Sequence, residues 1–122
     1  ISSFLDDVGH PRVTLSLTPP HARLAGTTLR AVVEAAGTRL GNVCLWSVSP
    51  DIESVDHMGP GEDQVPGNGK TDFGAITHML EDRNYFGMFT FIWNGTQDWT
   101  IAQTVSHVEK ARGHVLAVAK GS

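Results

Sequence analysis

The 122-residue sequence lacks the features by which several classes of protein are usually recognised. Its single cysteine, Cys44, has no partner for an internal disulfide. Its formal net charge of -4 gives no basic face for nucleic acid. No apolar run approaches the roughly 20 residues that cross a bilayer, and no basic-then-apolar leader opens the chain. We therefore expect a soluble, cytoplasmic protein without nucleic-acid or membrane partners.

What the sequence does contain is typical of one globular domain. Hydrophobic residues make up 40% of the chain and charged residues 18%, and the length is near the commonest domain size. Cys44 lies in the apolar run NVCLW, which favours a small buried side chain over a reactive nucleophile. The chain begins with Ile1 rather than methionine, so we expect residues 1–122 to be one segment processed or cut from a longer chain.

Three short runs have the composition of β-strands. They span residues 13–17 (VTLSL), 43–48 (VCLWSV) and 88–93 (MFTFIW). Each is rich in β-branched, aromatic or other apolar residues and has no charged residue, as in strands covered on both faces of a parallel sheet.

Helical periodicity separates these runs, at residues 27–40, 72–85 and 98–111. Apolar residues recur there at the spacing of one helix face and are expected to pack on the sheet. These residues are Leu29, Val32, Val33, Ala36 and Leu40 in the first helix, Phe73, Ile76, Met79 and Leu80 in the second, and Ile101, Val105 and Val108 in the third. Asp98 is the expected N-cap of the third helix, and residues 1–8 are expected to end an earlier helix.

Strict alternation of helix and strand predicts an α/β fold with right-handed βαβ crossovers and a parallel sheet. Three strands alone leave both sheet edges open to pairing with another chain. We therefore expect the sheet to be completed by a further half or by a second copy of the chain. A small flavodoxin-like domain with an incomplete sheet is the alternative fold.

The segment PGNGKTDF, residues 66–73, resembles the end of a phosphate-binding loop. Such a loop needs glycine five positions before Gly69, where this chain has Gln64, and a strand that leads directly into it. The nearest expected strand ends far upstream, at Val48. The segment therefore does not favour a nucleotide triphosphate site, although a helix start after Asp72 is suited to attract an anion.

The same segment fits a different pattern when its context is included. A PGxGxxDF loop leads into a helix, a YxG turn opens the next strand, and LTPPHA follows the first strand. These elements are Pro66, Gly67, Gly69, Asp72 and Phe73, then Tyr85 with Gly87, and Leu17 to Ala22. Their order resembles the sugar isomerase/epimerase superfamily of xylose isomerase-like TIM barrels. The resemblance implies the C-terminal part of such a barrel, about strands six to eight.

The resemblance also implies an activity. Relatives isomerise or epimerise sugars with a divalent cation such as Mn²⁺ or Mg²⁺ at the C-terminal mouth of the barrel. In this chain the ligand positions of this half fall on Thr18, on Cys44 or a neighbour, and on Ile92. We therefore expect no metal ligand from this half. The implied function is an isomerase or epimerase of a small carbohydrate or polyol, and the alternative is a non-catalytic carbohydrate-binding or scaffold subunit.

The candidate site residues lie after the expected strands. His21 matches the histidine that contacts substrate in relatives and is the catalytic candidate, with a structural role in its loop as the alternative. The expected substrate-binding residues are Trp46, Ser47, His57, Lys70, Trp93 and Asn94. The tryptophans and the amide suit a sugar ring or simple packing, and Lys70 suits an anionic group or exposure to solvent. His57 lies among carboxylates, which suits either a bound cation or a solvated acidic loop.

Overall fold

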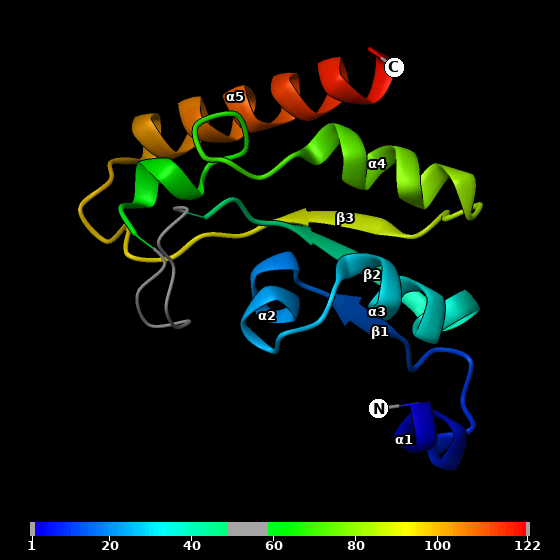
Figure 1. Cartoon of the computed structure of the whole chain (residues 1–122). Helices are drawn as coiled ribbons and strands as arrows, with labels where there is room; N and C mark the ends of the chain where they lie inside the picture. Colours follow the sequence, from blue (N-terminus) through cyan, green and yellow to red (C-terminus); the bar gives the residue numbers. More distant parts are fainter. Residues whose placement is uncertain (1, 49–58, 122) are drawn as a thin grey trace.

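The computed structural model describes residues 2–48 and 59–121 (Figure 1). Helices and strands alternate along the chain, with one additional helix after the first strand. The helices are α1 (Ser2–Val8), α2 (Pro19–Leu24), α3 (Leu29–Ala36), α4 (Phe73–Asp82) and α5 (Ile101–Lys120). The strands are β1 (Leu15–Leu17), β2 (Leu40–Leu45) and β3 (Met88–Phe91), and two 3-10 turns, η1 and η2, span Gly37–Arg39 and Gly61–Gln64. None of the helices described is long and apolar enough to cross a membrane.

The three strands form one parallel sheet in the order β1-β2-β3. Leu17 lies opposite Val43, and Val43 lies opposite Phe89, while the pairing of β1 with β2 shifts by one residue between Leu15 and Ser16. This confirms the predicted α/β fold of parallel βα units. β1 and β3 are shorter than their apolar runs predict. β2 spans Leu40–Leu45 rather than residues 43–48, because the η1 turn ends the α3 region before Leu40, so Leu40 lies in a strand and not on the predicted helix.

One face of the sheet carries the hydrophobic core. Val43 and Leu45 of β2 pack there against Val33 of α3 and against Phe73 and Leu80 of α4. Phe73 is 1% exposed and Val43 is fully buried. Both helices therefore cover the same side of the sheet, which is the arrangement of a barrel segment with its helices outside. The apolar stripe predicted for residues 72–85 is confirmed, because Phe73, Ile76, Met79 and Leu80 are all buried.

The opposite face of the sheet is polar, which differs from the expectation of strands that are apolar on both faces. Asn42 Nδ2 donates a hydrogen bond of 3.0 Å to Ser16 Oγ, and Thr90 Oγ1 donates one of 2.9 Å to Asn42 Oδ1. These side chains come from all three strands because alternate residues of a strand share a face. Ser16 and Thr90 are exposed in the described part of the chain, so this face is open.

The two glycine motifs have structural causes. A methyl group on Gly69 would overlap Ser47 Oγ and the main-chain carbonyl of Asp63, so only glycine lets this loop lie against the end of β2. A methyl group on Gly87 would overlap the ring of Tyr85, which explains the YxG spacing. Asp72 Oδ1 accepts the Ala75 N–H at 2.9 Å and caps α4. The loop is therefore a tight connection into α4.

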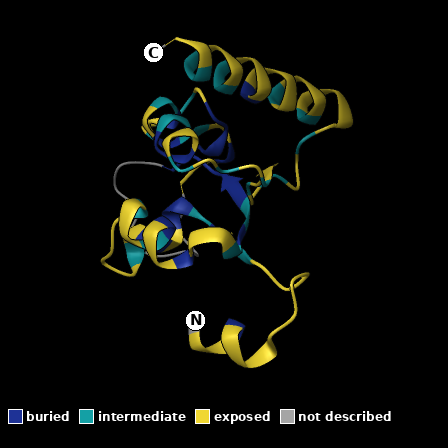
Figure 2. Cartoon of the chain, turned by 90° about the vertical axis from the view of Figure 1, so that its right-hand side faces the viewer, coloured by how far each residue is buried: buried dark blue, intermediate teal, exposed yellow. Residues whose placement is uncertain are grey.

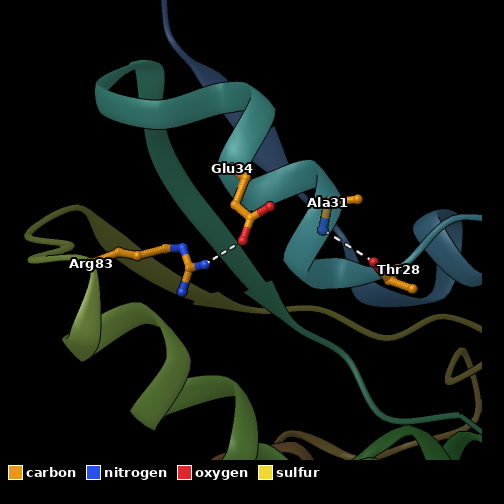
Figure 3. A network of polar contacts seen from close by, with 4 residues as sticks. All are labelled: Thr28, Ala31, Glu34 and Arg83. Carbon is orange, nitrogen blue, oxygen red and sulfur yellow. Dashed lines mark hydrogen bonds and ion pairs between the residues drawn. The ribbon is translucent and has the colours of Figure 1, made fainter.

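Figure 3 shows two polar contacts of α3, one within its own first turn and one to the end of α4. Thr28 Oγ1 accepts the Ala31 N–H at 3.1 Å and caps the start of α3. At the other end, Arg83 reaches from the end of α4 to Glu34 of α3, with a nitrogen–oxygen distance of 2.5 Å. The Glu34 side chain is 55% exposed, so this ion pair is expected to contribute no more than about 1 kcal/mol.

The last helix, α5, differs from its prediction in two ways. Its N-cap is Thr100, not Asp98, and the Gln103 side chain completes a capping box with it. The expected stripe of Ile101, Val105 and Val108 faces solvent, with Ile101 85% exposed. Figure 2 shows most of α5 in the colour of exposed residues.

The cause is the length of α5, which continues to Lys120. Its C-terminal half offers a second apolar stripe, made of Ala111, Val115 and Val118, about a quarter of a turn from the first. Ala111 is fully buried, and Val115 and Val118 pack against the core.

Candidate functional site

The carboxyl ends of all three strands lie at one edge of the sheet because the strands are parallel. Thr18, Trp46 and Ile92 are the first residues after β1, β2 and β3. In barrels built from parallel βα units, the loops at this edge carry the functional groups. This edge is therefore the candidate site.

His21 lies on α2, the short helix that directly follows β1. Pro19 and Pro20 occupy its first positions, where the missing N–H groups of proline cost no helical hydrogen bond. The His21 ring stands edge-on to the Trp46 ring, with 5.8 Å between centroids and 78° between planes. His21 is exposed, whereas Trp46 is only 5% exposed. The structure thus brings together two predicted residues, one accessible and one fixed beneath it.

Gln64 holds this arrangement in place and was not predicted as a site residue. Its Oε1 accepts the Trp46 Nε1–H and the Asn94 main-chain N–H, both at 2.9 Å. Its Nε2 donates to the carbonyl oxygens of Gly59 at 3.0 Å and Asn94 at 3.2 Å. The side chain is 1% exposed and uses its full hydrogen-bonding capacity. From η2 it ties together the residue after β2, the segment before η2 and the segment after β3.

The aromatic residues after β3 form a packed series. Trp93 stacks on Phe91 at 6.5 Å and contacts Trp99 at 6.0 Å, and Trp99 stacks on His107 of α5 at 4.1 Å. Trp93 is half-buried. Asn94 enters the Gln64 network through its main chain, and its side chain is exposed. Their contact with a substrate stays a prediction.

Three other residues were predicted to contact the substrate: Ser47, Lys70 and His57. Ser47 is fully buried beneath the glycine loop, and its Oγ donates to Thr71 Oγ1 at 3.5 Å. Lys70 is exposed and lines a hollow of about 320 Å³ together with residues of α2 and the start of α3. His57 lies outside the described residues. The roles of all three in substrate binding remain predictions.

The positions expected to carry metal ligands do not suit a hard divalent cation. Such ions prefer carboxylate, carbonyl and imidazole ligands. Thr18 offers a hydroxyl, Ile92 offers no donor, and Cys44 is buried, with its Sγ 3.6 Å from Ser16 Oγ. Within residues 2–48 and 59–121, no three His, Cys, Asp or Glu side chains gather as a metal group would require.

A larger hollow, of about 700 Å³, lies at the opposite edge of the sheet, where the strands begin. Tyr85 lines it and donates a hydrogen bond of 2.5 Å to the Met88 carbonyl. Burial raises the pKa of the Tyr85 phenol, and the nearby Cys44 raises it further. In (β/α)₈ barrels this amino-terminal edge serves stability and the carboxyl edge serves catalysis. The His21 edge therefore remains the candidate site.

The parallel βα units have the fold of part of a TIM barrel, and comparison with solved structures agrees. D-psicose 3-epimerase from Clostridium cellulolyticum H10, in its structure with D-tagatose, matches with a TM-score of 0.67 and 17% identity. An L-ribulose 3-epimerase matches with a TM-score of 0.61 and 19% identity. The expected fold, part of a TIM barrel, is confirmed.

The extent of the similarity is asymmetric. The matches cover 96% and 98% of this chain but only 42% and 41% of the two epimerase chains. The chain therefore has the fold of part of a barrel, while the numbering of its strands as six to eight rests on the sequence motifs. No protein-family model matches the sequence, and the comparison with curated proteins finds no match.

Proposed function

We propose that this chain forms the substrate-contacting wall of an isomerase- or epimerase-like barrel that acts on a small carbohydrate or polyol. The observation that carries the proposal is the edge-on pair of His21 and Trp46 at the carboxyl edge of the sheet. The fold that the chain shares with parts of the two epimerases supports it. Polyhydroxy ligands are bound by precisely placed donors and acceptors; the exposed His21 ring offers both, and the buried Trp46 holds that ring in place.

His21 is proposed as the catalytic group, in contact with a substrate hydroxyl. An imidazole can donate a hydrogen bond through one ring nitrogen and accept one through the other, so it can assist a proton transfer at a sugar hydroxyl. Trp46 fixes the plane of the imidazole, and Gln64 fixes Trp46. Trp93, Asn94 and Lys70 are proposed as further substrate contacts at the same edge.

The proposed site needs a complement, which we propose to be an N-terminal half-barrel, with a second copy of this chain as the alternative. Both flanks of the sheet support this. Phe4 is 63% and Val13 40% exposed in the segments before β1, and Phe89 of β3 is 45% exposed. The matched chains are more than twice as long as this one. An (β/α)₈ barrel has eight strands, so about five would come from the complement.

A second candidate function is a non-catalytic carbohydrate-binding or scaffold subunit of the same fold. It is favoured by the residues at the expected ligand positions, because Thr18, Cys44 and Ile92 offer neither carboxylate nor imidazole. In this case the His21–Trp46 pair binds a sugar without transforming it.

Epimerisation of ketoses by the full-length protein tests the proposal, with exchange of the substrate carbon-bound proton for deuterium followed by NMR. We expect His21→Ala to reduce kcat by about 100-fold, the size of a typical general acid–base contribution. His10→Ala is the matched control, since His10 is an exposed turn histidine whose Nδ1 accepts the Arg12 N–H.

Binding without turnover that is lost in His21→Ala would favour the second function. Turnover that is unchanged in His21→Ala would contradict the proposed catalytic role.

A further inference from the structure

The chain contains two Asn–Gly pairs, Asn68–Gly69 and Asn94–Gly95. In such a pair the main-chain nitrogen of glycine can attack the side-chain amide carbon of asparagine, because glycine has no side chain to hinder the approach. The new nitrogen–carbon bond closes a succinimide ring, and the broken carbon–nitrogen bond of the amide releases ammonia. Water then opens the ring to aspartate or isoaspartate. Neither step requires an enzyme, an oxidant or a cofactor.

The fold protects the first pair. Asn68 Nδ2 donates a hydrogen bond of 3.0 Å to the Glu62 carbonyl oxygen, which holds the side-chain amide in one orientation. The main chain of Gly69 has no room to turn, because a methyl group there would overlap Ser47 Oγ and the Asp63 carbonyl oxygen. Ring closure requires the side chain and the main chain to rotate toward one another. Asn68 must therefore leave its contacts before it can react.

The second pair is open, since Asn94 and Gly95 are both exposed. Within residues 2–48 and 59–121, no atom beyond the chain neighbours of Gly95 lies within 4 Å of the place that a side chain there would occupy. The Asn94 side chain makes no hydrogen bond in the part of the chain that the structure describes. Its main chain is held instead, because its N–H donates to Gln64 Oε1 and its carbonyl accepts from Gln64 Nε2. The reacting amide is therefore accessible and unrestrained.

We propose that Asn94 is a site of spontaneous deamidation, which alters the attachment of the segment after β3 to Gln64. In isoaspartate the main chain runs through the former side-chain carbon. The carbonyl that accepts the Gln64 Nε2–H then becomes a carboxylate outside the main chain, and the segment is lengthened by a carbon atom. In aspartate the main chain is unchanged and only a negative charge is added. The isoaspartate product is therefore the one that disturbs the Gln64 network.

Incubation of the full-length protein at mildly alkaline pH, followed by peptide mass spectrometry, tests the site. Electron-transfer fragmentation distinguishes aspartate from isoaspartate in the products. We expect Asn94 to react at least about 10-fold faster than Asn68, because Asn68 must first lose a hydrogen bond and its packing. The control is the protein unfolded in urea, in which both pairs should react at similar rates. Equal rates in the folded protein, or a faster reaction at Asn68, would overturn the inference.

Gly95→Ala should slow the reaction at Asn94, because its methyl group hinders the attacking nitrogen, and should leave Asn68 unaffected. Circular dichroism checks that this variant remains folded. An undiminished rate at Asn94 in the folded variant would contradict attack by the Gly95 nitrogen.

Urea unfolding of fresh and incubated protein tests the effect on the Gln64 network. We expect the fraction that contains isoaspartate to unfold at a lower urea concentration than the fresh protein. Asn94→Asp is the matched control, because it adds the charge and keeps the main chain, and its midpoint should stay close to that of the parent. An unchanged midpoint in the isoaspartate fraction, or an equal loss in Asn94→Asp, would overturn the proposed effect on Gln64. The reaction requires no ligand, so these outcomes are independent of the proposed function.

Discussion

The replacement of Gln64 by alanine tests how the candidate site is held together. The Gln64 side chain joins the end of β2 to the segment after β3, through Trp46 Nε1 and the main chain of Asn94. Gly59 and Asn94 are exposed, so water can replace Gln64 at their main-chain groups. Trp46 is 5% exposed, so its Nε1–H would be left without a partner.

The expected cost follows from these surroundings. An unpaired buried donor costs about 1–3 kcal/mol, and the space left by a buried side chain adds to this. We therefore expect Gln64→Ala to lower the free energy of unfolding by about 2–4 kcal/mol. The measurement is urea unfolding of the full chain, followed by tryptophan fluorescence, which also reports the surroundings of Trp46.

The matched control is Gln97→Ala. Gln97 lies in the segment after β3 but is exposed, so its replacement should change the free energy of unfolding by less than about 0.5 kcal/mol. A loss of under 1 kcal/mol for Gln64→Ala, or equal losses for the two variants, would refute the view that Gln64 fixes the site.

Two further predictions concern stability. Gly69→Ala should lower the free energy of unfolding by about 1–3 kcal/mol, because a methyl group would overlap Ser47, whereas Gly113→Ala on α5 meets no neighbour and should raise it by up to about 1 kcal/mol. Equal effects in chemical unfolding would contradict the close approach at Gly69. Because burial raises the pKa of the Tyr85 phenol in the folded chain, its contribution to stability should be complete below about pH 10 and lost as the pH rises through the raised value. Unfolding measured from pH 8 to 11 should show this loss in the parent chain but not in Tyr85→Phe, and identical pH profiles would be the contrary result.

The features that sequence reasoning predicted are those encoded by nearby residues. The spacing of Phe73, Ile76 and Leu80 places them on one face of a helix, and all three are buried. The strict alternation of helix and strand predicted the parallel sheet. The helical periodicity gave a wrong prediction of the buried face of α5. Ile101 and Val105 form a regular apolar stripe, but the position of α4 leaves that stripe exposed to solvent. Which of two stripes is buried depends on tertiary packing.

The candidate site was predictable only in part. His21 was identified from a motif, and Trp46 from its position at the end of a strand. Gln64 was missed because its partners, Trp46 and Asn94, lie 18 and 30 residues away in the sequence, and no local pattern marks such a residue. The sequence analysis predicted no helix at α2, although two consecutive prolines suit the first positions of a helix.

The most direct test of the central claim is NMR of the full-length protein during titration with a ketose. The ring protons of His21 and the Nε1–H of Trp46 report the edge where the sheet strands end. We expect these signals to shift together and saturate, while those of Tyr85 and Phe86 at the opposite edge do not change. Shifts confined to the opposite edge, or no saturable shift at His21 and Trp46, would contradict the claim that this chain contacts a sugar there.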